Sequence, residues 1–153
     1  MTTGMPIMVP HNEAVLFNEA EEAITGIRHV NELFLNLVRA NPSAMNSTLE
    51  LVATREGAIA LSAFGHNITA APRIVFNDGS ALMEYSFTTP DGEDEVEVAR
   101  FYLSRNGIFF NTVARDEQFG DVQHSAVIGS IIGRVAKGLL LSSLFRPKSD
   151  LTL

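Results

Sequence analysis

The sequence predicts an α+β fold, a six-stranded antiparallel meander sheet flanked by an N-terminal and a C-terminal helix. Two long segments, one near each end of the chain, carry apolar residues at spacings of three and four, as in helices that bury one face. Between them, short runs of β-forming residues alternate with turn sequences and no helical segment intervenes, so successive strands should be antiparallel. The 153 residues suit one domain, which we expect to span residues 11–146, after a flexible lead-in (1–10) and before a frayed tail (147–153).

The first helix is expected from about Asn12 to Ala40. Asn12 is a suitable N-cap, and Asn41-Pro42 ends the helix because the residue before a proline is disfavoured in helical conformation. Gly26 is a weak point, at which the helix could kink or break. The apolar stripe expected to face the core consists of Val15, Ala20, Ala23, Ile24, Ile27, Val30, Phe34, Leu37 and Val38.

The first hairpin should join residues 48–54 to residues 58–64. Its loop, Arg55-Glu56-Gly57, suits a type I turn followed by a glycine in the left-handed conformation. This loop length sets Leu51 opposite Leu61, so that the apolar residues of both strands share one face.

The second hairpin should join residues 68–76 to residues 81–88 around Asp78-Gly79. This loop sets Ile74 opposite Met83. Pro72 has no N–H to donate to a ladder, so it is expected at an edge or a bulge.

The third hairpin, residues 95–114, should organise the sheet. Its Asn106-Gly107 pair favours a two-residue type I′ turn, in which both central residues have positive φ. That turn sets Leu103 opposite Phe110. The valines that precede the apolar run alternate out of phase with it, so a β-bulge is expected near Val98–Arg100. The face predicted to be buried consists of Ala99, Phe101, Leu103, Ile108, Phe110 and Ala114.

The second helix is expected from Val122, capped by Asp121, to about Phe145. Arg134 and Lys137 in its middle oppose a transmembrane span, since a cation is costly at the centre of a bilayer. Small side chains on this helix predict a close approach by another backbone, either from the sheet and first helix or from a second copy. These small residues are Ser125, Gly129, Gly133 and Gly138.

Composition excludes several classes of function. The net charge of −7 disfavours nucleic-acid binding, which needs a basic face. No cysteine is present, so disulfides and thiolate chemistry are excluded, and the four histidines lack the spacing of metal ligands. No nucleophile or phosphate-loop motif occurs, and the N-terminus does not have the features of a secretory signal. We therefore expect a cytoplasmic protein with no catalytic residue, no cofactor and no metal.

These observations favour a small acidic non-enzymatic protein-binding domain, of a regulatory, inhibitor or chaperone-like kind, that self-associates. In combining terminal helices with a sheet in an acidic chain, it resembles small acidic secretion chaperones, although the helix those domains have between strands is missing; acidic inhibitor proteins of mobile elements fit equally. The expected partner is another protein, with a basic surface that complements an acidic turn. The candidate partner-binding residues are Glu93, Asp94 and Glu95 of that turn and, on the far face of the third hairpin, Arg100, Tyr102, Phe109, Asn111 and Val113.

An alternative hypothesis is an α+β cup that binds a small molecule and performs simple acid–base chemistry. A curved sheet closed by a long helix can enclose an apolar cavity, and such cavities are common ligand sites. The polar residues expected to line it are His66, Tyr85 and Glu84.

Overall fold

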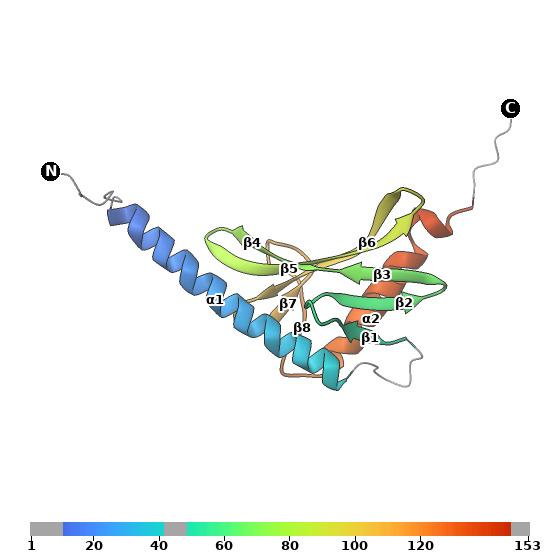
Figure 1. The fold of residues 1–153 in the computed structure, drawn as a ribbon, viewed down its shortest axis with the longest axis horizontal. Helices are drawn as coiled ribbons and strands as arrows, with labels where there is room; N and C mark the ends of the chain where they lie inside the picture. The colour runs from blue at the N-terminus through green and yellow to red at the C-terminus, as the bar shows by residue number, and fades with distance from the viewer. Residues whose placement is uncertain (1–10, 42–48, 148–153) are drawn as a thin grey trace, which may run out of the picture.

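The computed structural model describes residues 11–41 and 49–147, in which two helices flank a curled antiparallel sheet (Figure 1). The predicted α+β class is confirmed, with eight strands among the described residues in place of six. The predicted lead-in lies outside the described residues, as does the predicted tail apart from Pro147. The elements are α1 (His11–Ala40), β1 (Leu51–Ala53), β2 (Ile59–Ala63), β3 (His66–Ala70), β4 (Pro72–Asn77), β5 (Ser80–Asp91), β6 (Asp94–Ser104), β7 (Ile108–Phe110), β8 (Gln118–Asp121), α2 (Ala126–Leu140) and the 3₁₀ helix η1 (Ser143–Phe145).

Helix α1 runs without interruption through Gly26, the predicted weak point. The side chain of Arg105, from the β6–β7 turn, lies against this glycine where a Cβ would otherwise be. The C-terminal part of the helix packs on the sheet through a stripe at helical spacing. The apolar residues of α1 that are buried are Ala23, Ile27, Val30, Phe34, Leu35 and Val38.

The first two hairpins have the predicted registers. Leu51 lies opposite Leu61, and Gly57 has a left-handed φ of 87°. Ile74 lies opposite Met83, but the strand expected over residues 68–76 is divided before Pro72. β3 pairs with both β2 and β5, whereas β4 pairs with β5 alone, so the proline starts an edge strand as its missing N–H requires.

The long strands β5 and β6 contain the predicted bulge. Phe87 lies opposite Ala99, and the next residue, Thr88, lies opposite Glu97. Val98 is therefore the extra residue on β6.

The predicted register between β6 and β7 is wrong by one residue. Leu103 lies opposite Phe109, not Phe110, so the loop contains the three residues Arg105–Gly107. Because side chains alternate along a strand, this shift turns Phe109 into the core and leaves Phe110 half-buried.

The turn itself explains the shift. Gly107 has a φ of 86°, whereas Asn106 is not among the described residues with positive φ, so the turn is not type I′. The N–H of Gly107 donates to the carbonyl of Ser104 at 3.0 Å. This is a type I turn followed by a left-handed glycine, the same arrangement as in the first hairpin.

The pairing of β7 with β6 also ends earlier than predicted. After Phe110 the chain turns, with the N–H of Arg115 donating to the carbonyl of Thr112 at 3.1 Å, and it returns as β8, which pairs with β7. The hairpin expected over residues 95–114 therefore has no pairing with β6 beyond Phe110. Within the described residues, β6 therefore has no strand partner on this side before Tyr102.

Helix α2 is shorter than predicted at both ends. Residues expected to form a turn make β8, and the Asp121 carboxylate accepts the N–H of Gln123 at 2.9 Å instead of capping a helix. Ser125 is the N-cap residue, and the chain leaves α2 after Leu140 to form η1.

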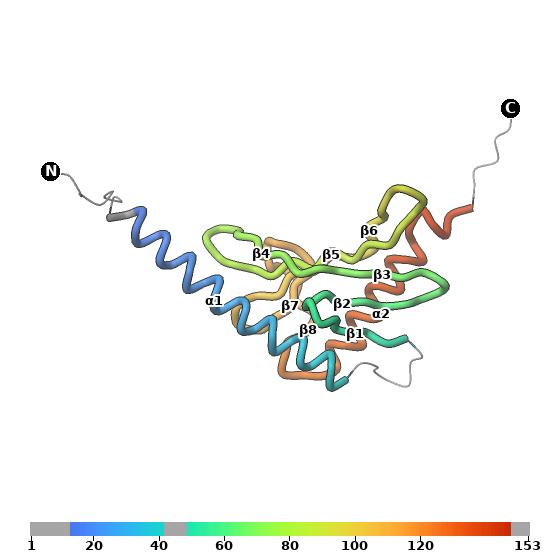
Figure 2. The backbone as a smooth tube through the Cα atoms, in the orientation of Figure 1, coloured from blue at the N-terminus to red at the C-terminus, as the bar shows by residue number. Residues whose placement is uncertain are grey.

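Both helices contribute to one apolar core inside the curled sheet. The Phe34 ring of α1 makes edge contacts with Tyr85 and Phe109, at centroid distances of 5.4 and 4.9 Å. Phe101 contacts Phe119 of β8 at 5.6 Å, which continues the aromatic packing toward α2. The backbone trace in Figure 2 shows that α1 reaches this core with its C-terminal part only.

Candidate binding surfaces

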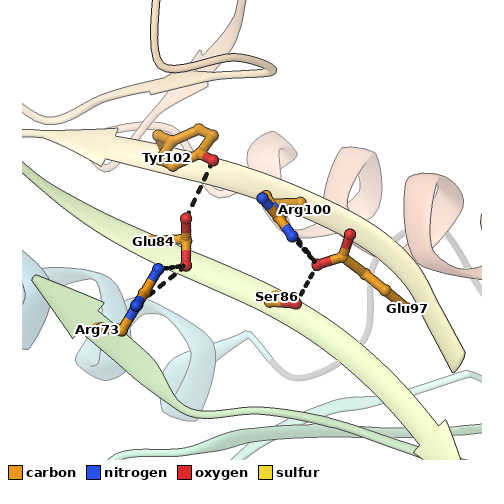
Figure 3. Close-up of polar contacts among 6 residues, drawn as sticks. All are labelled: Arg73, Glu84, Ser86, Glu97, Arg100 and Tyr102. Atoms are coloured by element: carbon orange, nitrogen blue, oxygen red, sulfur yellow. Dashed lines mark hydrogen bonds and ion pairs between the residues drawn. The ribbon is translucent and has the colours of Figure 1, made fainter. Parts of the chain in front are cut away.

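The face of the sheet that points away from the core carries two polar clusters (Figure 3). In the first, Glu84 accepts hydrogen bonds from Arg73 (Nη2–Oε1, 2.9 Å) and from the Tyr102 hydroxyl (3.1 Å). Glu84 and Tyr102 are buried, and burial raises the pKa of Tyr102, which keeps its hydroxyl proton available for this bond. Since each of the three has a partner, the cluster links β4, β5 and β6.

The second cluster lies nearer the N-terminal end of β6, where it spans the bulge. Glu97 accepts hydrogen bonds from the Ser86 hydroxyl and from Arg100 (Nε–Oε2, 2.8 Å). The hydrogen bond to Glu97 raises the pKa of Arg100 above its already high ordinary value. The Arg100 side chain is therefore occupied on the outer face of the sheet (Figure 3).

The residues predicted to form a binding patch on the far face of the third hairpin do not all lie on one face. Phe109 lies in the core, because the three-residue turn reverses the faces of β7. Asn111 and Val113 lie after β7, in the connection to β8. Arg100 and Tyr102 share the outer face of β6, where Tyr102 is only 5% exposed.

The acidic turn predicted as a partner-binding site is exposed to solvent. Glu93, Asp94 and Glu95 are all exposed at the junction of β5 and β6, where Gly92 has a φ of 66°. The turn projects beyond the sheet near the C-terminal end of α2 (Figure 1). The residues that the structure describes contain no group of three or more histidine or acidic side chains able to hold a metal ion.

The three residues of the alternative ligand pocket do not line one cavity. Tyr85 points into the core and donates to buried Asn31, and burial raises the pKa of its phenol far above the ordinary 10.0. Glu84 points to the opposite face, because successive side chains of a strand alternate. His66 packs on Phe145 at the edge of the sheet, with ring centroids 5.4 Å apart.

A groove of about 560 Å³ runs between β6 and α2. It lies beside the part of β6 that β7 leaves unpaired, so it exists because the third hairpin is shorter than the sequence predicts. Sequence reasoning missed this site, since the third hairpin was expected to continue past Phe110 to residue 114. The groove is lined by Val98, Ala99, Arg100, Phe101, Ser130, Gly133, Arg134, Lys137, Gly138 and Leu141.

Two glycines of α2 have opposite surroundings in this groove. A Cβ built on Gly138 would overlap the carbonyl oxygen of Val98, so glycine allows the helix to touch the backbone of β6. The predicted close approach of another backbone is therefore confirmed at Gly138. A Cβ built on Gly133 meets nothing within 4 Å, so this residue faces open space in the groove.

The helix side of the groove carries two cations. The guanidinium of Arg134 lies 4.0 Å from the ring centroid of Phe119 and donates to the Asn111 side chain, so two contacts fix its position. Lys137 follows one turn later, and no carboxylate among the described residues forms an ion pair with it. No acidic residue is among the described residues that line the groove, which makes it a basic site in a chain of net charge −7.

The N-terminal part of α1, residues 13–22, extends beyond the sheet and is called the α1 extension below (Figures 1 and 2). Leu16 and Phe17 there are 65% and 64% exposed. Leu16 falls on the same helix face as the buried Ile27, so the apolar stripe continues past the edge of the sheet. Val15, predicted to belong to the buried stripe, is also exposed, because the sheet does not reach it.

Comparison with protein-family models, with curated proteins and with solved structures gave no match to this chain. Among the described residues, neither helix combines the length and the apolarity that crossing a bilayer requires. The candidate sites are therefore argued from the geometry of this chain alone.

Proposed function

We propose that this protein is a non-enzymatic protein-binding domain whose partner docks on the α1 extension. The observation that carries the proposal is the apolar stripe of α1, which is covered by the sheet from Ala23 onward and continues uncovered through Leu16 and Phe17. A contiguous apolar helix face on a protein surface is typical of an interaction site. Amphipathic helices commonly bind by laying such a face against an apolar surface of a partner.

The charges of the α1 extension indicate the kind of partner. Glu13, Glu19, Glu21 and Glu22 lie on it, and no lysine or arginine occurs between His11 and Ile27. A surface that is apolar along its centre and acidic at its sides complements a partner with an apolar groove and a basic rim. This agrees with the basic partner surface that the net charge suggests.

The proposal can be tested with two synthetic amphipathic helical peptides that share a leucine face and carry either lysines or glutamates on the polar face. We expect the protein to bind the lysine peptide at least about tenfold more tightly in a fluorescence anisotropy titration at low salt. The double substitution Leu16→Asn/Phe17→Asn should weaken that binding about tenfold, because both side chains would contact the peptide. The melting temperature should stay unchanged, because both side chains are exposed.

The matched control is Val52→Asn/Phe76→Asn, which removes two apolar side chains that are 48% and 49% exposed on other elements. This variant should bind the lysine peptide like the wild-type protein. Equal binding of both peptides, or equal losses in both double variants, would show that the α1 extension is not a specific docking surface.

Self-association, expected from the sequence, is a separate prediction. Leu140, Leu141 and Phe145 are exposed at the C-terminal end of α2, beside the exposed Phe64, whose ring centroid lies 6.4 Å from that of Phe145. We expect light scattering at high micromolar concentration to report a dimer, and Leu141→Glu to convert it to a monomer. A wild-type protein that is monomeric at that concentration contradicts this prediction.

The alternative function, small-molecule binding with acid–base chemistry, has one supporting observation. The groove between β6 and α2 has a volume within the range of roughly 300–1,000 Å³ that is common for ligand pockets. However, its described lining contains neither histidine nor tyrosine. The groove therefore supports binding better than it supports proton transfer.

A further inference from the structure

We infer that the groove between β6 and α2 is a second docking site, which accepts an extended acidic segment of a partner protein as an added strand beside β6. This inference does not depend on the α1 extension, because it rests on different residues at a different part of the sheet.

Among the described residues, the backbone of β6 has no strand partner on the α2 side before Tyr102. β7 pairs with β6 only at Tyr102 and Leu103, and the chain then leaves the sheet after Phe110. Apart from the bulged Val98, the residues of β6 that precede Tyr102 pair with β5 on one side. On the other side α2 touches Val98, and no strand among the described residues pairs with Ala99–Phe101, which leaves an open edge there. Such an edge can pair with another extended chain.

The direction of the backbone groups can be followed along β6. The carbonyl of Ser104 faces the β7 side, since it accepts the N–H of Gly107 across the turn. In an antiparallel ladder every second residue directs both its N–H and its C=O to the same side. The backbone N–H and C=O of Tyr102 and of Arg100 therefore point to the β7 side too. At Arg100 this side is the groove. The Arg100 side chain instead pairs with Glu97 on the outer face of the sheet.

The groove leaves space for another chain beside this edge. α2 touches β6 at Gly138, where a side chain would overlap the Val98 carbonyl, and it leaves an opening at Gly133, where a Cβ would meet nothing within 4 Å. The helix thus covers one end of the groove and leaves room for an extended chain further along. Leu141, which is 67% exposed, and the half-buried Val98 supply apolar lining for its side chains.

The charges that line the groove identify its occupant. Arg134 is fixed by Phe119 and Asn111, and Lys137 has no carboxylate in an ion pair with it among the described residues. Glu97 lies nearby but is occupied by Arg100 and Ser86 on the other face. A strand with an aspartate or glutamate facing α2 would place its carboxylate near the two cations, whereas a basic strand would meet like charge.

The test begins with selection of displayed random peptides that bind the full-length wild-type protein. The selected peptides are then synthesised, and their affinities for the protein are measured by titration. We expect the selected peptides to be rich in aspartate and glutamate. Gly133→Leu, which fills the groove, and Lys137→Glu, which reverses its charge, should each weaken their binding about tenfold or more. Bound peptide should also slow hydrogen exchange of the Arg100 amide, measured by NMR, because that N–H becomes a donor in the new ladder.

The controls separate a local effect from misfolding. Gly133→Ala adds one methyl group in open space and Lys137→Arg keeps the charge, so both should bind the selected peptides within a few fold of the wild-type protein. Leu16→Asn/Phe17→Asn should also bind them normally, which distinguishes failure of this site from failure of the α1 extension.

Several results would overturn the inference. The first is a set of selected peptides without acidic residues, and the second is an affinity that Gly133→Leu does not change. The third is a bound peptide that leaves hydrogen exchange of the Arg100 amide unchanged. Faster exchange of that amide after removal of residues 148–153 would assign the groove to the chain's own C-terminal segment instead.

Discussion

Gly138→Ala is expected to lower the free energy of unfolding by about 3 kcal/mol, at the upper end of what overpacking commonly costs. A single methyl group has this effect because it would overlap the carbonyl oxygen of Val98, which belongs to the backbone and cannot rotate away. Val98 is also the bulged residue of β6, and its neighbours Glu97 and Ala99 are both held by pairing with β5. Relief therefore requires the whole helix to move away from the sheet. Urea unfolding followed by circular dichroism measures the change.

Gly133→Ala is the matched control, five residues earlier on the same helix. It makes the same chemical change where a Cβ meets nothing within 4 Å. Because alanine has a higher helix propensity than glycine, this variant should gain up to about 1 kcal/mol. If both variants were destabilised alike, the contact between α2 and β6 would not be as close as described here.

Much of the fold could be predicted because local signals and hydrophobic pattern agreed. In the first hairpin, glycine at the third loop position and the alternation of apolar residues led to the same register, and Leu51 does lie opposite Leu61. The bulge on β6 followed from a change of phase in the apolar pattern, and Val98 is the bulged residue. A strand register can be predicted from sequence when the turn residues and the apolar pattern favour the same pairing.

The third hairpin lacked that agreement. Asn106-Gly107 suits a type I′ turn, but the same glycine also suits the left-handed position after a type I turn, as Gly57 does in the first hairpin. The hydrophobic pattern could not decide between them, since residues 101–103 and 108–110 are apolar at every position. In the structure, the three-residue turn places Phe109 against Phe34 and Phe101, and β7 ends at Phe110 beside the groove that sequence reasoning missed.

The register of β7 leads to the second large expected effect. Phe109→Ala should cost about 3–5 kcal/mol, the usual range for a fully buried phenylalanine. Phe109 contacts the rings of Phe34 and Phe101, at centroid distances of 4.9 and 5.5 Å, so its removal leaves a cavity between α1 and the sheet. The type I′ register would instead place Phe110 in the core and make Phe109 the exposed neighbour.

Phe110→Ala is the control that decides between the two registers, because it removes the same side chain from the adjacent residue. Phe110 is half-buried, so its truncation should cost only about 1 kcal/mol. Equilibrium unfolding of both variants in urea compares the two costs directly, provided that the m values stay equal. A larger loss for Phe110→Ala than for Phe109→Ala would restore the two-residue turn. It would also let the strand continue toward Ala114 and pair with the edge of β6 that the proposed acidic segment needs.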